Sequence, residues 1–308
     1  MSSARTGWLI PAALTAASAM FSVVSPGLLL FIPLALALVA LPPRRGPLVM
    51  VGVGVLAIVL FGQSSETMWW FGRGWALMLG GWFVMVVSVQ PEGGFVNRGL
   101  AAVCGALASA AALLATQRSN WRQFDGSVAQ HMRDSAAQAA TQLGPSLANR
   151  EWGKEAIDAV HKSAELNAMI YPAWTALGSL CALAVVWWLW RRLTVRDARP
   201  LGGLREFRFR DELIWLGVVG VVLIVLPLNA AATRTGTNLA MFVGVLYALR
   251  GLGVGISLYG VPGPLGLIVS LMLLLLLFPM VATATLVLGL SDTWLDLRAR
   301  AGRNVRPM

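Results

Sequence analysis

Long apolar runs, separated by short polar connections, constrain the fold of this chain more than any other feature. Nine runs are present: Trp8–Ser25, Leu28–Leu41, Leu48–Phe61, Trp75–Val89, Gly99–Ala115, Pro172–Trp190, Leu213–Leu228, Asn238–Gly260 and Leu265–Leu290. Of 308 residues, 57% are hydrophobic and 12% charged, and the mean hydropathy is +0.71, so polar residues are too few to cover a soluble protein. We therefore expect an all-α polytopic transmembrane helical bundle, with the lipid bilayer as its first partner.

The number of crossings is not determined by the runs themselves. Several runs are shorter than the ~20 residues that a ~30 Å hydrocarbon core requires. Trp8–Ser25 resembles a signal peptide, but Leu28–Leu41 follows it almost at once, which favours a retained anchor helix. We expect about eight to ten membrane segments.

Basic residues predict the orientation. Arginines cluster at 44–45, at 191–210 and in the tail at 298–306, and short basic loops stay on the cytoplasmic side. Both termini are then cytoplasmic in a bacterial inner membrane, which nine crossings do not allow. Either Leu265–Leu290 is a hairpin of two short helices near Pro279, giving ten segments, or a short run such as Leu213–Leu228 is re-entrant, giving eight. The net charge of +10 is spread between apolar runs, which excludes a nucleic-acid-binding domain.

One long polar stretch, Gln117–Tyr171, interrupts the apolar runs and contains six basic and six acidic residues. Helical spacing of its apolar positions on either side of Gly144–Pro145 predicts two amphipathic helices broken at that dipeptide. The orientation makes this an extracytoplasmic insertion. We divide the chain into N-terminal membrane helices (1–116), the insertion (117–171), C-terminal membrane helices (172–290) and an Arg-rich cytoplasmic tail (291–308).

Arg250 is the exceptional charge inside an apolar run. An arginine in mid-helix costs about 2.5–3.5 kcal/mol on insertion scales and should face the bundle interior or a watery cavity. Tyr247 lies on nearly the same face, and Asn238 begins the run, so these three residues are the candidate substrate-binding set, suited to an anionic group. The alternative is that the helix breaks at Gly251 and leaves Arg250 near the cytoplasmic interface. Gly251 and Gly255 form a G-x-x-x-G pattern that permits close helix approach.

Two carboxylates near the tail form the second candidate group. Asp292 and Asp296 are four residues apart and share a face if they lie on one helix. They form either a site at the cytoplasmic mouth or a helix-start cap at Ser291 or Asp292, with Asp296 paired to a nearby arginine and Trp294 at the interface.

Signatures of enzymes are absent from the sequence, which contains no P-loop, H-E-x-x-H or C-x-x-C motif, so we expect no catalytic residues, no metal and no cofactor. Cys104 and Cys181 lie in separate apolar runs, and we interpret them as small core residues. Eight tryptophans lie near run ends and predict interfacial anchoring: Trp69, Trp70, Trp75, Trp174, Trp187, Trp188, Trp190 and Trp215.

The turn at Pro42–Gly46, the Asn238…Tyr247…Arg250 helix and the closing segment from Gly289 to Arg298 resemble the YybS-like family of predicted bacterial membrane proteins of unknown function. That family is distantly similar to the substrate-binding membrane subunits of energy-coupling-factor importers. The resemblance implies a transport-type fold and assigns no functional residues. It favours a subunit that binds a small metabolite and works with a separate ATPase or coupling module. The alternative is a membrane scaffold or assembly factor in cell-envelope growth that recruits envelope proteins.

Overall fold

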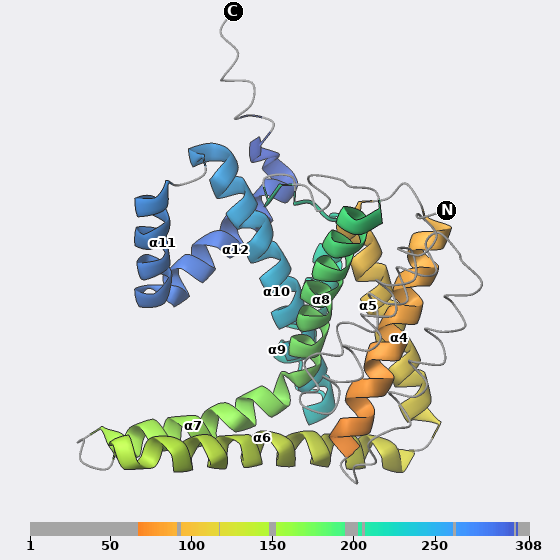
Figure 1. Cartoon of the computed structure of the whole chain (residues 1–308), viewed down its shortest axis with the longest axis vertical. Coiled ribbons are helices and arrows are strands. Elements are labelled where there is room, and N and C mark those ends of the chain that lie inside the picture. The colour runs from red at the N-terminus through yellow and green to blue at the C-terminus, as the bar shows by residue number, and fades with distance from the viewer. Residues whose placement is uncertain are drawn as a thin grey trace, which may run out of the picture. The chain divides into compact units, whose positions relative to one another are not determined.

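The computed structural model describes residues 67–90, 94–116, 118–147, 152–194, 203–204, 207–260, 263–298 and 300. Throughout these ranges the regular structure is helical, which confirms the all-α class (Figure 1). The three apolar runs before Thr67 lie outside the described residues, as do residues 301–308 of the tail. The chain divides into two compact units, 1–200 and 201–308, and each is described by itself.

The first unit contains three apolar helices: α4 (Thr67–Val89), α5 (Phe95–Ala115) and α8 (Tyr171–Thr194). α5 packs against both α4 and α8. At the contact between α4 and α5, the Trp82 indole lies where a Cβ on Gly105 would be, and its Nε1 donates a hydrogen bond of 2.9 Å to Ser109 Oγ. The small residues Gly105 and Ser109 therefore serve helix packing.

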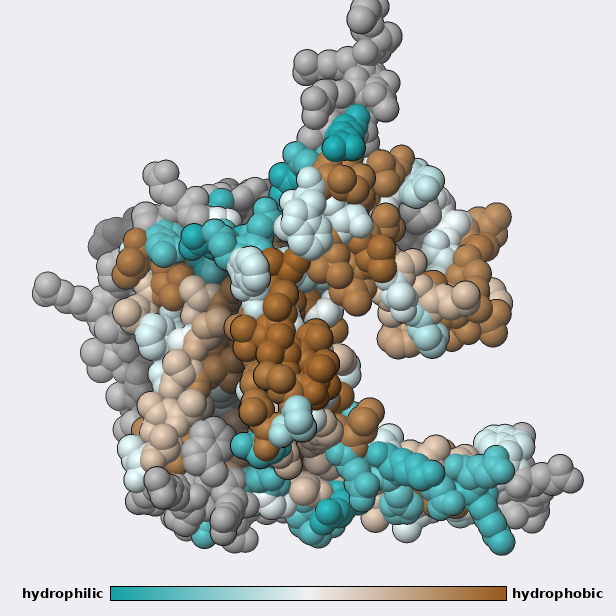
Figure 2. Space-filling model, turned by 180° about the vertical axis from the view of Figure 1, so that it is seen from behind, coloured by the Kyte–Doolittle hydropathy of each residue, from teal (hydrophilic) through white to brown (hydrophobic). Residues whose placement is uncertain are grey.

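The polar insertion forms two long helices, α6 (Arg118–Leu147) and α7 (Gly153–Met169), which pack against each other and carry a largely hydrophilic surface (Figures 1 and 2). The predicted break at Gly144–Pro145 is wrong, because α6 continues through both residues to Leu147. Pro145 removes one helical hydrogen bond, and so close to the helix end few turns remain to be disturbed. α7 ends one residue before α8, with only Ile170 between them.

The second unit contains α9 (Leu213–Val225), α10 (Ala230–Tyr259), α11 (Pro264–Leu276) and α12 (Phe278–Leu295). α10 packs against both α9 and α12. Asn229 begins α10 by accepting a hydrogen bond of 2.8 Å from the Ala232 amide at its side-chain oxygen. α10 then runs unbroken to Tyr259, so the predicted alternative of a helix break at Gly251 is wrong.

The last apolar run is two helices that meet at Leu277, close to the predicted division near Pro279, but only α11 is short, since α12 has 18 residues. Among the described residues, five helices are long and apolar enough to cross a membrane: α4, α5, α8, α10 and α12. α9 and α11, at 13 residues each, are shorter than a full crossing requires. The total number of crossings stays a prediction, because the first three runs are not described.

One prediction about a single residue type is wrong. Cys104 and Cys181 are free and exposed, and not core residues. A membrane helix presents apolar side chains outward as well as inward, so an apolar run does not imply burial in protein. Conversely, Trp75, Trp187 and Trp190 are buried between helices of the first unit. Trp75 Nε1 donates a hydrogen bond of 2.9 Å to Ser179 Oγ on α8.

Candidate functional site

The candidate site lies at a crossing where α10 and α12 touch backbone to backbone. A Cβ on Gly251 would overlap the Thr285 carbonyl, and one on Gly289 would overlap the Tyr247 carbonyl. Because neither glycine has a Cβ, the two helices approach until their main chains are in contact. Asp292 follows Gly289 by three residues and so reaches Arg250, the neighbour of Gly251.

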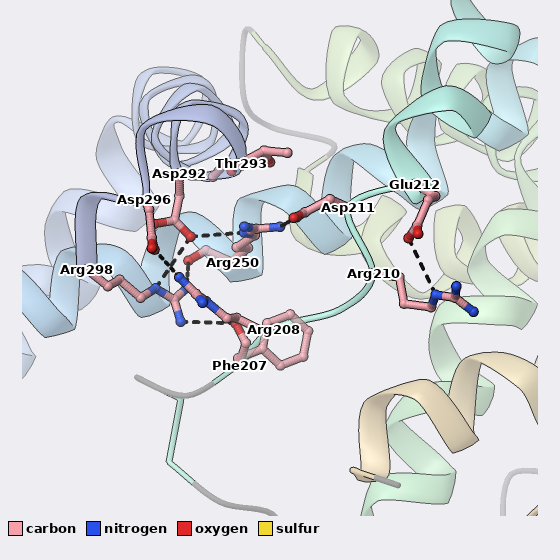
Figure 3. Close-up of polar contacts among 11 residues, drawn as sticks. Phe207, Arg208, Arg210, Asp211, Glu212, Arg250, Asp292, Thr293, Asp296 and Arg298 are labelled. Carbon is pink, nitrogen blue, oxygen red and sulfur yellow. Dashed lines mark hydrogen bonds and ion pairs between the residues drawn. The ribbon is translucent and has the colours of Figure 1, made fainter. Parts of the chain in front are cut away.

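Arg250 is 3% exposed at its side chain and is held by two carboxylates (Figure 3). Its Nε donates a hydrogen bond of 3.0 Å to Asp292 Oδ2, and its Nη1 donates one of 2.5 Å to Asp211 Oδ1. The two carboxylates differ in environment, since the side chain of Asp292 is 0% exposed and that of Asp211 is 60% exposed. The guanidinium also lies 5.6 Å from the centre of the Phe209 ring.

Arg298 connects the end of α12 to this pair. Its Nη2 donates a hydrogen bond of 2.9 Å to the Arg250 carbonyl, and its Nη1 donates one of 3.2 Å to the Phe207 carbonyl. Its Nε lies 3.6 Å from Asp292 Oδ2. Burial lowers the pKa of the Arg298 guanidinium, and the Asp292 carboxylate acts in the opposite direction. Arg298 therefore ties α10, α12 and the segment before α9 together.

Asp296 ends α12 with a left-handed backbone, at φ 42° and ψ 56°, which aspartate tolerates better than most residues. Its carboxylate pairs with Arg208, as Figure 3 shows, and both side chains are about half exposed. With Arg250, Arg298, Asp211 and Asp292, this pair makes a charge network of three arginines and three aspartates. The network is neutral and extends from a buried interior to an exposed edge.

Asp292 Oδ1 is buried in the network with no hydrogen-bond partner among the described residues. The hydroxyl of Tyr247 is buried beside the network and has the Thr293 side chain as its hydrogen-bonding neighbour. Tyr247 is 0% exposed, and its ring meets the edge of Phe209 with 5.1 Å between ring centres. Unpartnered buried polar atoms are costly and mark places where a further polar group can bind.

The structure brings together some of the predicted residues and separates others. Arg250, Tyr247, Asp292 and Asp296 lie in or against the network. Asn238 does not, because it precedes Arg250 by twelve residues, or about 18 Å of helix, and its amide donates to the Arg234 carbonyl. The predicted helix-start cap is also wrong, since Ser291 and Asp292 lie in the last turns of α12. The prediction that Asp296 pairs with an arginine is confirmed.

Sequence reasoning missed Asp211, Arg208 and the role of Arg298. Arg208 and Asp211 lie in the segment before Leu213 and Arg298 lies in the tail, where arginines indicate only the orientation of the membrane helices. No group of three metal-ligating side chains lies together in the described ranges.

The fold and the site together define a class: a helical, multi-pass membrane protein with a buried charge network where two helices cross at glycines. The chain belongs to DUF2232, a family of predicted membrane proteins, which matches residues 9–293. Neither a curated protein nor a solved structure matches the chain.

Proposed function

We propose that the protein is a transport-type membrane subunit that binds a small metabolite through an anionic group at Arg250. The observation that carries the proposal is the asymmetry of the two carboxylates on that arginine. Asp292 is buried and fixed by the helix crossing, whereas Asp211 is exposed and lies in the turn before α9. Charged residues within membrane helices commonly mark substrate pathways.

The asymmetry suggests how a ligand would enter. An exposed ion pair contributes about 0–1 kcal/mol, so an incoming carboxylate or phosphate displaces Asp211 at little cost. Asp292 meanwhile keeps the Arg250 guanidinium in place, because breaking the buried pair would cost several kcal/mol. The Tyr247 hydroxyl supplies a nearby buried hydrogen-bonding group. Asp211 acts as a replaceable stand-in for the anionic group of the ligand.

A transport subunit of this kind needs a separate motor, since the sequence contains no phosphate-binding P-loop. The resemblance to the YybS-like family, and through it to the membrane subunits of energy-coupling-factor importers, supports the same proposal. A separate ATPase or coupling module is the expected protein partner.

The test begins with gentle purification in lipid nanodiscs and mass spectrometry of every protein and small molecule retained. A stoichiometric metabolite or an ATPase would support the proposal. The retained metabolite is then titrated against thermal unfolding. Arg250→Ala should abolish the stabilisation, whereas Asp211→Asn should strengthen binding because it removes the competitor. Glu212→Gln is the matched control, because Glu212 is the exposed neighbour and pairs with Arg210. Unchanged binding in Arg250→Ala would remove Arg250 from the site.

A membrane scaffold or assembly factor is the second candidate, and the charge balance of the network favours it. Three arginines paired with three aspartates hold helices together without any ligand. This function predicts retained envelope proteins and no metabolite. Deleting residues 301–308 would then reduce partner recovery while leaving Arg298 and the network intact. A tail-deleted protein that keeps every partner would contradict recruitment by the tail.

A further inference from the structure

Arg98, in the first turns of α5, is a buried cation with nothing to neutralise it in the described part of the chain. The residue is 3% exposed. Its Nε is buried without a hydrogen-bond partner, and its guanidinium makes no ion pair or hydrogen bond with the described residues. A guanidinium has five N–H donors and no acceptor, so this environment leaves its hydrogen-bonding capacity unused.

A second arginine lies near Arg98 and adds positive charge. Its guanidinium carbon lies 4.9 Å from the centre of the Trp187 ring, and that of Arg191 lies 5.6 Å from the same ring. The two arginines are near enough to repel each other. A cation–π contact recovers only a small part of the free energy lost when a guanidinium leaves water. Arg98 is therefore a buried cation beside a second arginine, and no described residue supplies Arg98 with an anion.

The position in the fold suits an anion as well. Arg98 lies near the start of α5, and Arg191 lies in the last turn of α8, so the ends of two candidate spans meet here. The first amides of α5 receive no side-chain cap from Gly94. Uncapped amides at a helix N-terminus attract negative charge. Span ends with arginine and tryptophan are typical of the headgroup region, where basic pockets between helices bind lipid phosphates.

We propose that Arg98, Arg191 and Trp187 form a binding site for one phosphate-type anion at the junction of α5 and α8. The anion is carried either by an anionic phospholipid headgroup or by a free phosphate. Its oxygens accept hydrogen bonds from both guanidinium groups, and its charge removes their mutual repulsion. This site lies in the first unit and does not rest on the function proposed for Arg250.

The experiment uses the full chain in two arms that distinguish the sources. In the lipid arm, nanodiscs contain mixed phosphatidylglycerol and phosphatidylcholine, and native mass spectrometry after partial delipidation counts the phosphatidylglycerol retained. In the free-anion arm, nanodiscs contain phosphatidylcholine alone, and inorganic phosphate is titrated against thermal unfolding. The variants are Arg98→Gln and Arg191→Gln. Arg192→Gln is the matched control, because Arg192 belongs to the same helical turn but lies over Trp188.

We expect wild type and Arg192→Gln to bind the anion equally well. Each of the two site variants should bind it at least about tenfold more weakly, as loss of a charge-assisted hydrogen bond implies. A selective effect in the lipid arm identifies the headgroup as the source, and one in the titration identifies free phosphate. If Arg98→Gln fails to fold, Arg98→Lys replaces it and should retain part of the binding. Equal binding by wild type, Arg98→Gln and Arg191→Gln in both arms would overturn the proposal.

Discussion

Asp292 and Asp211 both pair with Arg250, so comparing them shows how burial changes the strength of an ion pair whose cation stays the same. Asp292 and Asp211 both accept hydrogen bonds from this guanidinium, at 3.0 Å and 2.5 Å. Replacing either by asparagine keeps the size of the side chain and removes the charge. The distances alone would rank Asp211 as the more important partner. Burial reverses that ranking, since Asp292 is 0% exposed at its side chain and Asp211 is 60% exposed.

The expected magnitudes differ severalfold. Removing one partner of a buried ion pair costs about 3–5 kcal/mol, and we expect Asp292→Asn to lie near 3 because the amide still accepts one hydrogen bond. Asp211→Asn should cost less than about 1 kcal/mol, as for other exposed pairs. At roughly 2–4 °C per kcal/mol, the first change lowers the Tm by roughly 6–12 °C and the second by less than about 4 °C.

The assay is thermal unfolding of each full-length variant in the same lipid nanodiscs, followed by tryptophan fluorescence. A double variant, Arg250→Gln with Asp292→Asn, completes a mutant cycle. Because it removes the stranded charge, it should be less destabilised than the sum of the two single changes. Equal Tm values for Asp292→Asn and Asp211→Asn, or additive effects in the cycle, would refute the reasoning that burial decides the strength of these pairs.

Three further sets of substitutions test other contacts. Gly251→Ala should destabilise the protein by about 1–3 kcal/mol in a thermal melt, because the new Cβ would overlap a carbonyl of α12. Gly255→Ala should be neutral or stabilising in the same assay, because a Cβ there would point into open space. Trp75→Phe should cost about 1 kcal/mol through the lost hydrogen bond to Ser179, measured in the same way. Asp296→Val should lower the Tm more than Asp296→Asn, because a β-branched residue is strained at φ 42°; equal values would argue against that backbone conformation.

The sequence predicted the positions of the helices better than it predicted which side chains pair with each other. Apolar runs located α5, α8 and α9 to within about four residues and found the ends of α4 and α10, whose starts lie eight residues earlier than predicted, because hydropathy is a local property. The burial of Arg250 was also predictable, since a charge in an apolar run must find a polar environment. Its partner Asp292 lies 42 residues away. Nothing in the spacing shows that α12 crosses α10 where Gly289 meets Gly251, and that crossing brings the Asp292 carboxylate to Arg250.

Arg98 shows a different limit of sequence reasoning. It stands one residue before the predicted run that begins at Gly99, so it looked like an ordinary flanking charge. The helix in fact begins at Phe95, which brings Arg98 inside it. Element boundaries are the least reliable part of such predictions, and here an error of four residues hid a buried cation. The proline at 145 misled in the opposite way, because it signalled a break that α6 does not make.

The join between α7 and α8 has a mechanical consequence. Only Ile170 separates the two helices, and helical hydrogen bonds continue across it. The Ile170 amide donates to the Leu166 carbonyl, and the Ile170 carbonyl accepts from the Trp174 amide. Figure 1 shows the two helices meeting at a bend, and Pro172, which has no amide hydrogen, is the second residue of α8. The pair of polar helices, α6 and α7, is thus joined to α8 without a flexible linker. A force that displaces α6 and α7 should therefore tilt or rotate α8, whose C-terminal end contains Trp187 and Arg191.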